Sequence, residues 1–122
     1  MSSMMRLVPL GLDVLFVLIF SALGRMSHGE SPLGVFVTAW PFLVACLVAW
    51  VIIAALGDMG AGWRAGVVSW LVTWLGGIAV RLMSDTSAAV AFILVAGGML
   101  ALFLLGWRAC WTLIERRRAA QA

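Results

Sequence analysis

Four long apolar runs constrain the fold of this chain of 122 residues more than any other feature. They cover about residues 7–24, 35–56, 63–82 and 87–107. Crossing a hydrocarbon core about 30 Å thick takes about 20 helical residues. Barrel strands would alternate polar and apolar side chains, which these continuously apolar runs do not. The sequence therefore predicts an all-α fold: a four-helix transmembrane bundle in one domain, 1–122, with a basic cytoplasmic tail over 108–122.

The composition fits lipid surroundings. Hydrophobic residues make up 65% of the chain and charged residues 11%, whereas soluble chains have about 25% charged residues. The eight basic residues, all arginines, stand at the ends of the runs rather than in a patch, so we expect no nucleic-acid partner. Cys46 and Cys110 have no metal-binding spacing, and one histidine cannot supply paired haem ligands. We expect no metal and no cofactor.

The arginines also predict an orientation. With four spans, both termini lie on one side, and that side would carry six arginines: Arg6, Arg64, Arg108, Arg116, Arg117 and Arg118. The other side would carry two, Arg25 and Arg81. The positive-inside rule then places both termini in the cytoplasm of a multi-pass protein of the inner (plasma) membrane. Trp63-Arg64 and Trp107-Arg108 are typical of anchors at a membrane interface.

A weaker pattern suggests an internal duplication. A shift of 56 residues places Arg25 on Arg81 and Pro41 on Gly97, so each half contains two helices and a short polar loop. Two hairpins of equal orientation would form a parallel repeat. Apolar helices resemble one another by chance, and this alternative stays open.

The first candidate site lies at the predicted outer ends of the first and third runs. Residues 24–30 contain Arg25, Ser27 and His28, and topology brings Arg81 to the same membrane face. Guanidinium groups suit carboxylate or phosphate, and a histidine can change charge near neutral pH. One interpretation is an anion site, a lipid-headgroup site or a proton-linked gate. The other is two snorkelling arginines neutralised by Glu30 and Asp85.

The second candidate site is Asp13, inside the first run. A carboxylate at this depth costs about 2.5–3.5 kcal/mol on insertion scales, so it is expected to face the bundle and to have a partner. Arg64 and Arg108 lie at the same end of the bundle. The alternatives are an intramembrane ion pair, and a carboxylate that binds a cation or relays protons.

Small and polar residues indicate helix packing. In lipid, close approach of backbones drives association, and small residues permit it. The candidates lie in the third and fourth runs: Gly62, Gly66, Ser69, Thr73, Gly77, Gly97 and Gly98. The pattern leaves open whether the neighbour belongs to the same chain.

Three short segments together resemble a known family. They are Gly24-Arg25-Met26-Ser27-His28-Gly29, Ala39-Trp40-Pro41-Phe42 and Gly106-Trp107-Arg108, with Asp13 in the first run. With these residues the chain resembles the small bacterial and archaeal membrane proteins of the domain of unknown function 3054 family, over nearly its whole length. The resemblance implies four spans and transfers no activity.

Three functions are compatible with these patterns. The first is a non-enzymatic component that binds or transports a small anionic or amphipathic solute through Arg25, His28, Arg81 and Asp13. Four spans rarely enclose a path alone, so this implies a homo-oligomer or a larger membrane complex in the lipid bilayer. The second is an accessory or structural subunit of a larger membrane complex. The third, an enzyme acting on lipid, lacks a nucleophile motif or an acid pair, and we expect no enzymatic activity.

Overall fold

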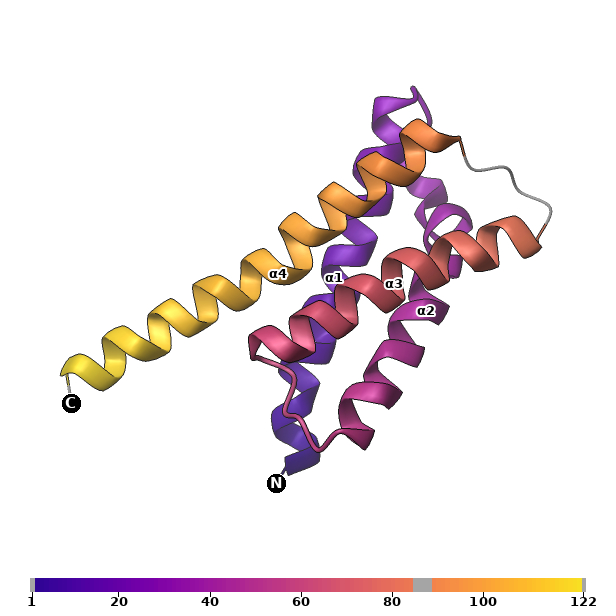
Figure 1. The fold of residues 1–122 in the computed structure, drawn as a ribbon. Helices are drawn as coiled ribbons and strands as arrows, with labels where there is room; N and C mark the ends of the chain where they lie inside the picture. The colour runs from indigo at the N-terminus through magenta and orange to yellow at the C-terminus, as the bar shows by residue number, and fades with distance from the viewer. Residues whose placement is uncertain (1, 85–88, 122) are drawn as a thin grey trace.

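The computed structural model describes residues 2–84 and 89–121. These residues form four α-helices and one 3-10 turn (Figure 1): α1 Ser2–Ser27, η1 Pro32–Gly34, α2 Val35–Ala55, α3 Trp63–Met83 and α4 Val90–Gln121. Each α-helix is long and apolar enough to cross a membrane. The predicted all-α fold with four apolar spans is confirmed.

The helix ends differ from the predicted runs in three places. α1 begins at Ser2 and not at about residue 7. α1 ends at Ser27, where Gly29 adopts a φ of 74° and the Glu30 amide donates to the Arg25 carbonyl at 2.8 Å. This left-handed glycine closes the helix, so His28 lies in a turn. The segment 108–121, predicted as a tail, continues α4, because it contains neither Gly nor Pro and is rich in helix-forming Arg and Ala. The predicted start of the fourth run at 87, and Asp85, lie outside the described residues.

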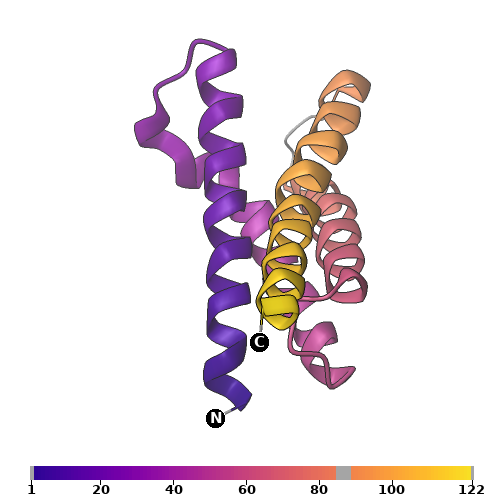
Figure 2. The same ribbon diagram turned by 90° about the vertical axis from the view of Figure 1, so that its left-hand side faces the viewer.

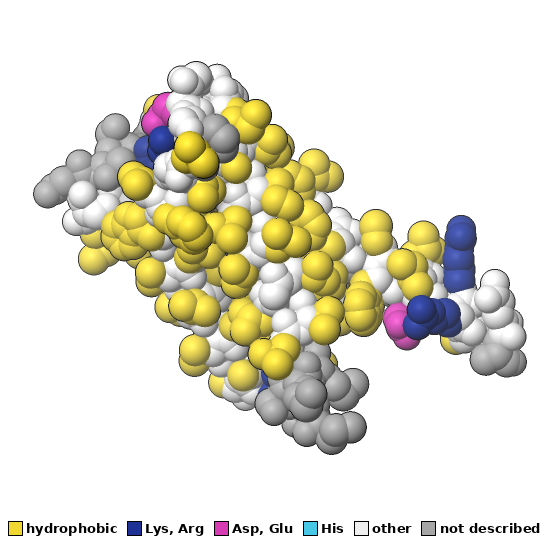
Figure 3. Space-filling view, turned by 180° about the vertical axis from the view of Figure 1, so that it is seen from behind, with side chains coloured by type: hydrophobic (Ala, Val, Ile, Leu, Met, Phe, Trp, Pro, Cys, Tyr) yellow, Lys and Arg dark blue, Asp and Glu magenta, His cyan; other side chains and the backbone are white. Residues whose placement is uncertain are grey.

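The helices are arranged as a ring in which each packs on the next along the chain. α2 and α3 share the most extensive interface, and α1 and α4, which close the ring, share the smallest. α4 leans away from α1 toward the end opposite the N-terminus (Figure 2). Residues 109–121 are exposed and project past the other helices, with charged side chains near the tip (Figure 3).

The unequal interfaces bear on the proposed duplication. Two equivalent hairpins would make the α2–α3 and α4–α1 interfaces alike, and they differ strongly. The same shift of 56 residues aligns Asp13 with Ser69 in the sequence. In the structure Ser69 Oγ donates a hydrogen bond of 2.7 Å to the Asp13 carboxylate. The duplication stays a prediction.

Glycines set how closely the helices approach. A Cβ on Gly77 would strike the ring of Phe42, which is fully buried between α2 and α3. A Cβ on Gly97 would lie 2.6 Å from Trp74, whose indole donates to the Ile93 carbonyl across the α3–α4 interface. Gly62 and Gly98 have no such neighbour among the described residues. Of these four glycines, only Gly77 and Gly97 therefore serve packing within the chain.

This difference predicts opposite effects of alanine at two glycines. Gly77→Ala should lower the free energy of unfolding by about 1–3 kcal/mol, because Phe42 cannot move aside in a filled interface. Gly98→Ala, the matched control in α4, should leave the free energy of unfolding unchanged or raise it by up to about 1 kcal/mol, because alanine favours the helix more than glycine does. Unfolding midpoints of both variants in detergent measure this. Equal midpoints would contradict the packing argument.

Candidate functional site

Asp13 is the centre of a buried polar network that includes all four α-helices. Its side chain is fully buried, and five donors surround the carboxylate. Oδ1 accepts from Trp107 Nε1 and Arg108 Nη1, each at 2.8 Å. Oδ2 accepts from Ser69 Oγ at 2.7 Å, Arg108 Nη2 at 2.8 Å and Trp50 Nε1 at 2.9 Å. A bidentate arginine and three neutral donors therefore satisfy both oxygens of the carboxylate.

Arg108 is satisfied as completely as its partner. It is 2% exposed, and its Nε donates to the Gly60 carbonyl at 2.8 Å. Its Nη1 also donates to the Leu104 carbonyl, one turn earlier in α4, at 2.8 Å. The guanidinium carbon lies 4.4 Å from the centre of the Trp107 ring. Each guanidinium nitrogen thus has an acceptor, as a buried cation requires.

Two glycines make room for this network. Gly60, in the loop before α3, has a φ of 100°, and a Cβ there would strike the Trp50 ring. A Cβ on Gly66, in the first turns of α3, would lie 2.8 Å from Arg108 Cδ. Larger residues at these positions would displace two of the groups that donate to Asp13. The Gly66 of the predicted packing row therefore packs against a charged side chain and not only against a helix backbone.

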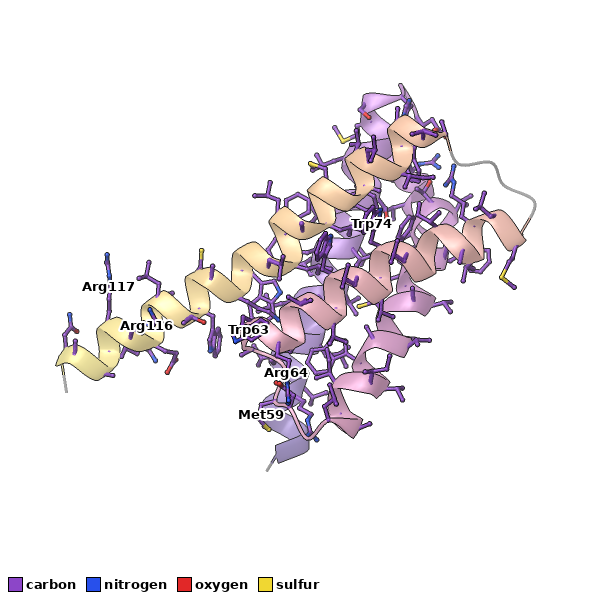
Figure 4. The ribbon with its side chains drawn as sticks, viewed as in Figure 1. Met59, Trp63, Arg64, Trp74, Arg116 and Arg117 are labelled. Carbon is purple, nitrogen blue, oxygen red and sulfur yellow. The ribbon has the colours of Figure 1, made fainter. Side chains whose placement is uncertain are left out.

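Arg64 does not reach Asp13. Its side chain is 54% exposed at the start of α3 (Figure 4) and pairs with Asp58 at 3.1 Å. The structure therefore brings Asp13 and Arg108 together and places Arg64 outside the network. Because every carboxylate oxygen already has two or more donors, the geometry favours an ion pair over a relay or a cation site.

The sequence did not predict that Trp50, Gly60, Ser69 and Trp107 are partners of this pair, and Ser69 was predicted only to pack helices. Trp107 and Arg108 were predicted to anchor the chain at a membrane interface, and this is wrong because both are buried and bonded to Asp13. Trp50 and Gly60 carried no prediction. A usable signal existed, since a buried indole N–H needs an acceptor and Asp13 was the only carboxylate within a span.

A cavity of about 750 Å³ lies between α1 and α4 at the end opposite the N-terminus, and we name it the distal cavity. All four residues of the first candidate site line it, together with Glu30 and Thr38: Arg25, Ser27, His28 and Arg81. They come from α1, the turn after it and α3. The volume lies within the roughly 300–1,000 Å³ of small-molecule sites.

Arg25 is fixed at the mouth of the distal cavity. Its Nε donates to the Ser31 carbonyl at 2.7 Å and its Nη1 to Thr38 Oγ1 at 3.2 Å. Nη1 also lies 3.5 Å from Glu30 Oε2, and Glu30 is 55% exposed. A Cβ on Gly34 would lie 2.5 Å from Nη2, so this glycine makes room for the guanidinium.

Arg81 and the apolar wall complete the distal cavity. The Arg81 guanidinium carbon lies 4.7 Å from the centre of the Phe92 ring, a cation–π contact. The wall below is apolar and comes from α1 and α4, with Phe20, Phe92, Val95, Ala96 and Met99. Charge lies at one end of the cavity and hydrocarbon along its length.

Comparison with known proteins gives one match. The family model described as "Protein of unknown function (DUF3054)" matches residues 10–111, which include both candidate sites. This confirms the resemblance drawn from the sequence. The comparison with curated proteins found no match, and neither did that with solved structures.

The buried pair predicts strong coupling between Asp13 and Arg108. Asp13→Asn and Arg108→Gln should each lower the free energy of unfolding by about 3–5 kcal/mol, because each leaves a buried group without its partner. The double variant should lose clearly less than the sum of the two.

Arg64→Gln is the matched control for this cycle. It removes an exposed ion pair at the same end of the bundle and should cost about 1 kcal/mol or less. Unfolding of the four proteins in detergent gives the coupling energy. Additive effects of the two core substitutions would show that the pair does not stabilise the bundle.

Proposed function

This chain belongs to the DUF3054 family of proteins of unknown function, and we propose that it is a non-enzymatic membrane protein that binds a small anionic, amphipathic solute in the distal cavity. One observation carries the proposal. Two arginines from different helices, Arg25 of α1 and Arg81 of α3, line one cavity whose wall is largely apolar. Solutes with one charged end and one apolar end match that distribution.

The charges at the mouth favour an anion. Among the described residues that line the cavity, Arg25 and Arg81 contribute +2 and Glu30 contributes −1, so the sum is +1 with His28 neutral. The two hydrogen bonds to Ser31 and Thr38 hold the Arg25 guanidinium in place before a ligand arrives. A fixed guanidinium loses little conformational freedom on binding carboxylate or phosphate.

The Asp13 network limits what a single chain does with this ligand. Asp13, Arg108 and Trp107 fill the bundle between the distal cavity and the end that carries the N-terminus. Binding is therefore the role that we propose for one chain. Transport would need a path provided by further copies or by a larger membrane complex.

The orientation is part of the proposal. The arginine distribution supports both termini in the cytoplasm of the plasma membrane. Arg116 and Arg117 extend from the projecting end of α4 (Figure 4), as expected for groups that meet anionic lipid heads. The distal cavity then belongs to the outer half of the membrane.

A reporter fused after Ala122 should be active only in the cytoplasm, and periplasmic activity would overturn this orientation.

Binding is tested with two amphiphiles that share a tail and differ in charge. Dodecyl phosphate should bind the purified protein in a nonionic detergent, and zwitterionic dodecylphosphocholine should bind much more weakly. Arg25→Gln and Arg81→Gln should each weaken dodecyl phosphate binding roughly tenfold or more, since a charge-assisted hydrogen bond contributes about 1.5–3 kcal/mol. Native mass spectrometry of the complexes measures this.

Arg64→Gln serves as the matched control, because it removes an arginine outside the cavity and should leave binding unchanged. Unfolding midpoints of all variants establish that the bundle is intact. Equal binding of the two amphiphiles, or unchanged binding in both cavity variants, would refute the proposed function.

A further inference from the structure

The length of the distal cavity along α4 is comparable to the depth of one leaflet of a bilayer. On α4 its lining extends from Ala91, near the start of the helix, down to Met99. Eight residues of rise correspond to about 12 Å of helix. Half of a hydrocarbon core is about 15 Å. Along the axis of α4, which is inclined to α1 (Figure 1), the lining is thus nearly as long as the hydrocarbon of one leaflet is deep.

Polarity along the cavity follows the same order as in a lipid. On α1, the wall changes from Phe20 and Leu23 to Arg25 at the last turn and His28 beyond it. On the opposite side, Arg81 lies over Phe92, near the start of α4. Cations therefore lie at headgroup level, and apolar side chains lie at the level of acyl chains.

The side of the cavity is bounded by the α1–α4 interface, which is smaller than the interfaces between helices that follow one another in the chain. α1 and α4 diverge at this end (Figure 2), and the rim residues Leu23 and Val95 are 43% and 61% exposed. At this depth the surrounding medium is hydrocarbon. An apolar chain can therefore enter between the helices without crossing water.

The floor of the cavity is closed. Below Phe20 and Met99, the rings of Phe16 and Phe103 stack across the α1–α4 interface with centres 5.5 Å apart. The Asp13–Arg108 pair joins the same two helices beyond them. A chain lying in the cavity ends at this stack.

From these four features we infer that the ligand is a membrane lipid with a phosphate headgroup, taken sideways from the leaflet at the distal end. Arg25 and Arg81 hold the phosphate, and one acyl chain lies between α1 and α4 along Phe92, Val95 and Met99. The inference rests on the proposed function and adds to it the class of ligand and its route of entry.

The test uses the full chain in phosphatidylcholine vesicles that contain phosphatidic acid with a photoreactive diazirine in its acyl chain. After illumination, labelled residues are mapped by mass spectrometry. Label should concentrate on Phe20 and on the segment 92–99. Unlabelled phosphatidic acid should compete for it, and phosphatidylcholine should not. Label spread over lipid-facing residues of α2 such as Leu47 and Val51, without competition, would overturn the inference.

Two neighbouring substitutions separate cavity from surface. Val95→Trp narrows the rim and should abolish the focused label. Leu94→Trp adds the same bulk at a residue that is 66% exposed and does not line the cavity, and labelling should persist. Cross-links between two copies of the chain at Val95, in place of lipid, would show that a second copy occupies the cavity, which overturns the inference.

A further arm separates this inference from the proposed function. Arg25→Gln and Arg81→Gln should each reduce the competable label about tenfold, in line with the loss of a charge-assisted hydrogen bond. Glycerol 3-phosphate has the phosphate but no apolar tail. If it binds as tightly as dodecyl phosphate, and Val95→Trp weakens the binding of neither ligand, the proposed acyl-chain site is wrong and the anion site stands. If the arginine variants change neither binding nor labelling, both proposals fail.

Discussion

The ion pair between Asp13 and Arg108 is the interaction on which the rest of the structure depends. A carboxylate within a span costs about 2.5–3.5 kcal/mol to insert, and it is tolerated here because five donors surround it. Those donors come from α2, α3 and α4, and the carboxylate from α1. Satisfying a single group therefore fixes all four helices relative to one another, in surroundings where no hydrophobic effect acts between them.

The same interaction explains why the bundle is open at its distal end. Asp13 and Arg108 hold α1 and α4 together at one level, and the Phe16–Phe103 stack extends that contact. Beyond it the two helices diverge, and in a lipid environment no hydrophobic effect drives apolar surfaces to close. A firm contact at one level and a cavity of about 750 Å³ next to it are thus consequences of one arrangement.

The two polar clusters of this chain differ in their surroundings. In the Asp13 network each oxygen and each guanidinium nitrogen is used inside the protein, which suits a structural role. At the distal cavity the polar groups line a space that a ligand can enter, and the charges of the described lining residues sum to +1. This contrast, rather than the kinds of residue involved, is the basis for assigning ligand binding to the distal cavity.

The sequence by itself determined the four apolar helices, the need of Asp13 for a partner and the family, because length, hydropathy and short motifs are local properties. Only the tertiary structure decided that Arg108 and not Arg64 is that partner, 95 positions along the chain. It also decided that Trp107 faces inward and that His28 follows the end of α1. Those outcomes depend on helix crossings at Gly66 and Gly77 and on a loop bent at Gly60. The row of small residues marks the two helical glycines, but a local pattern does not encode which side chains they contact.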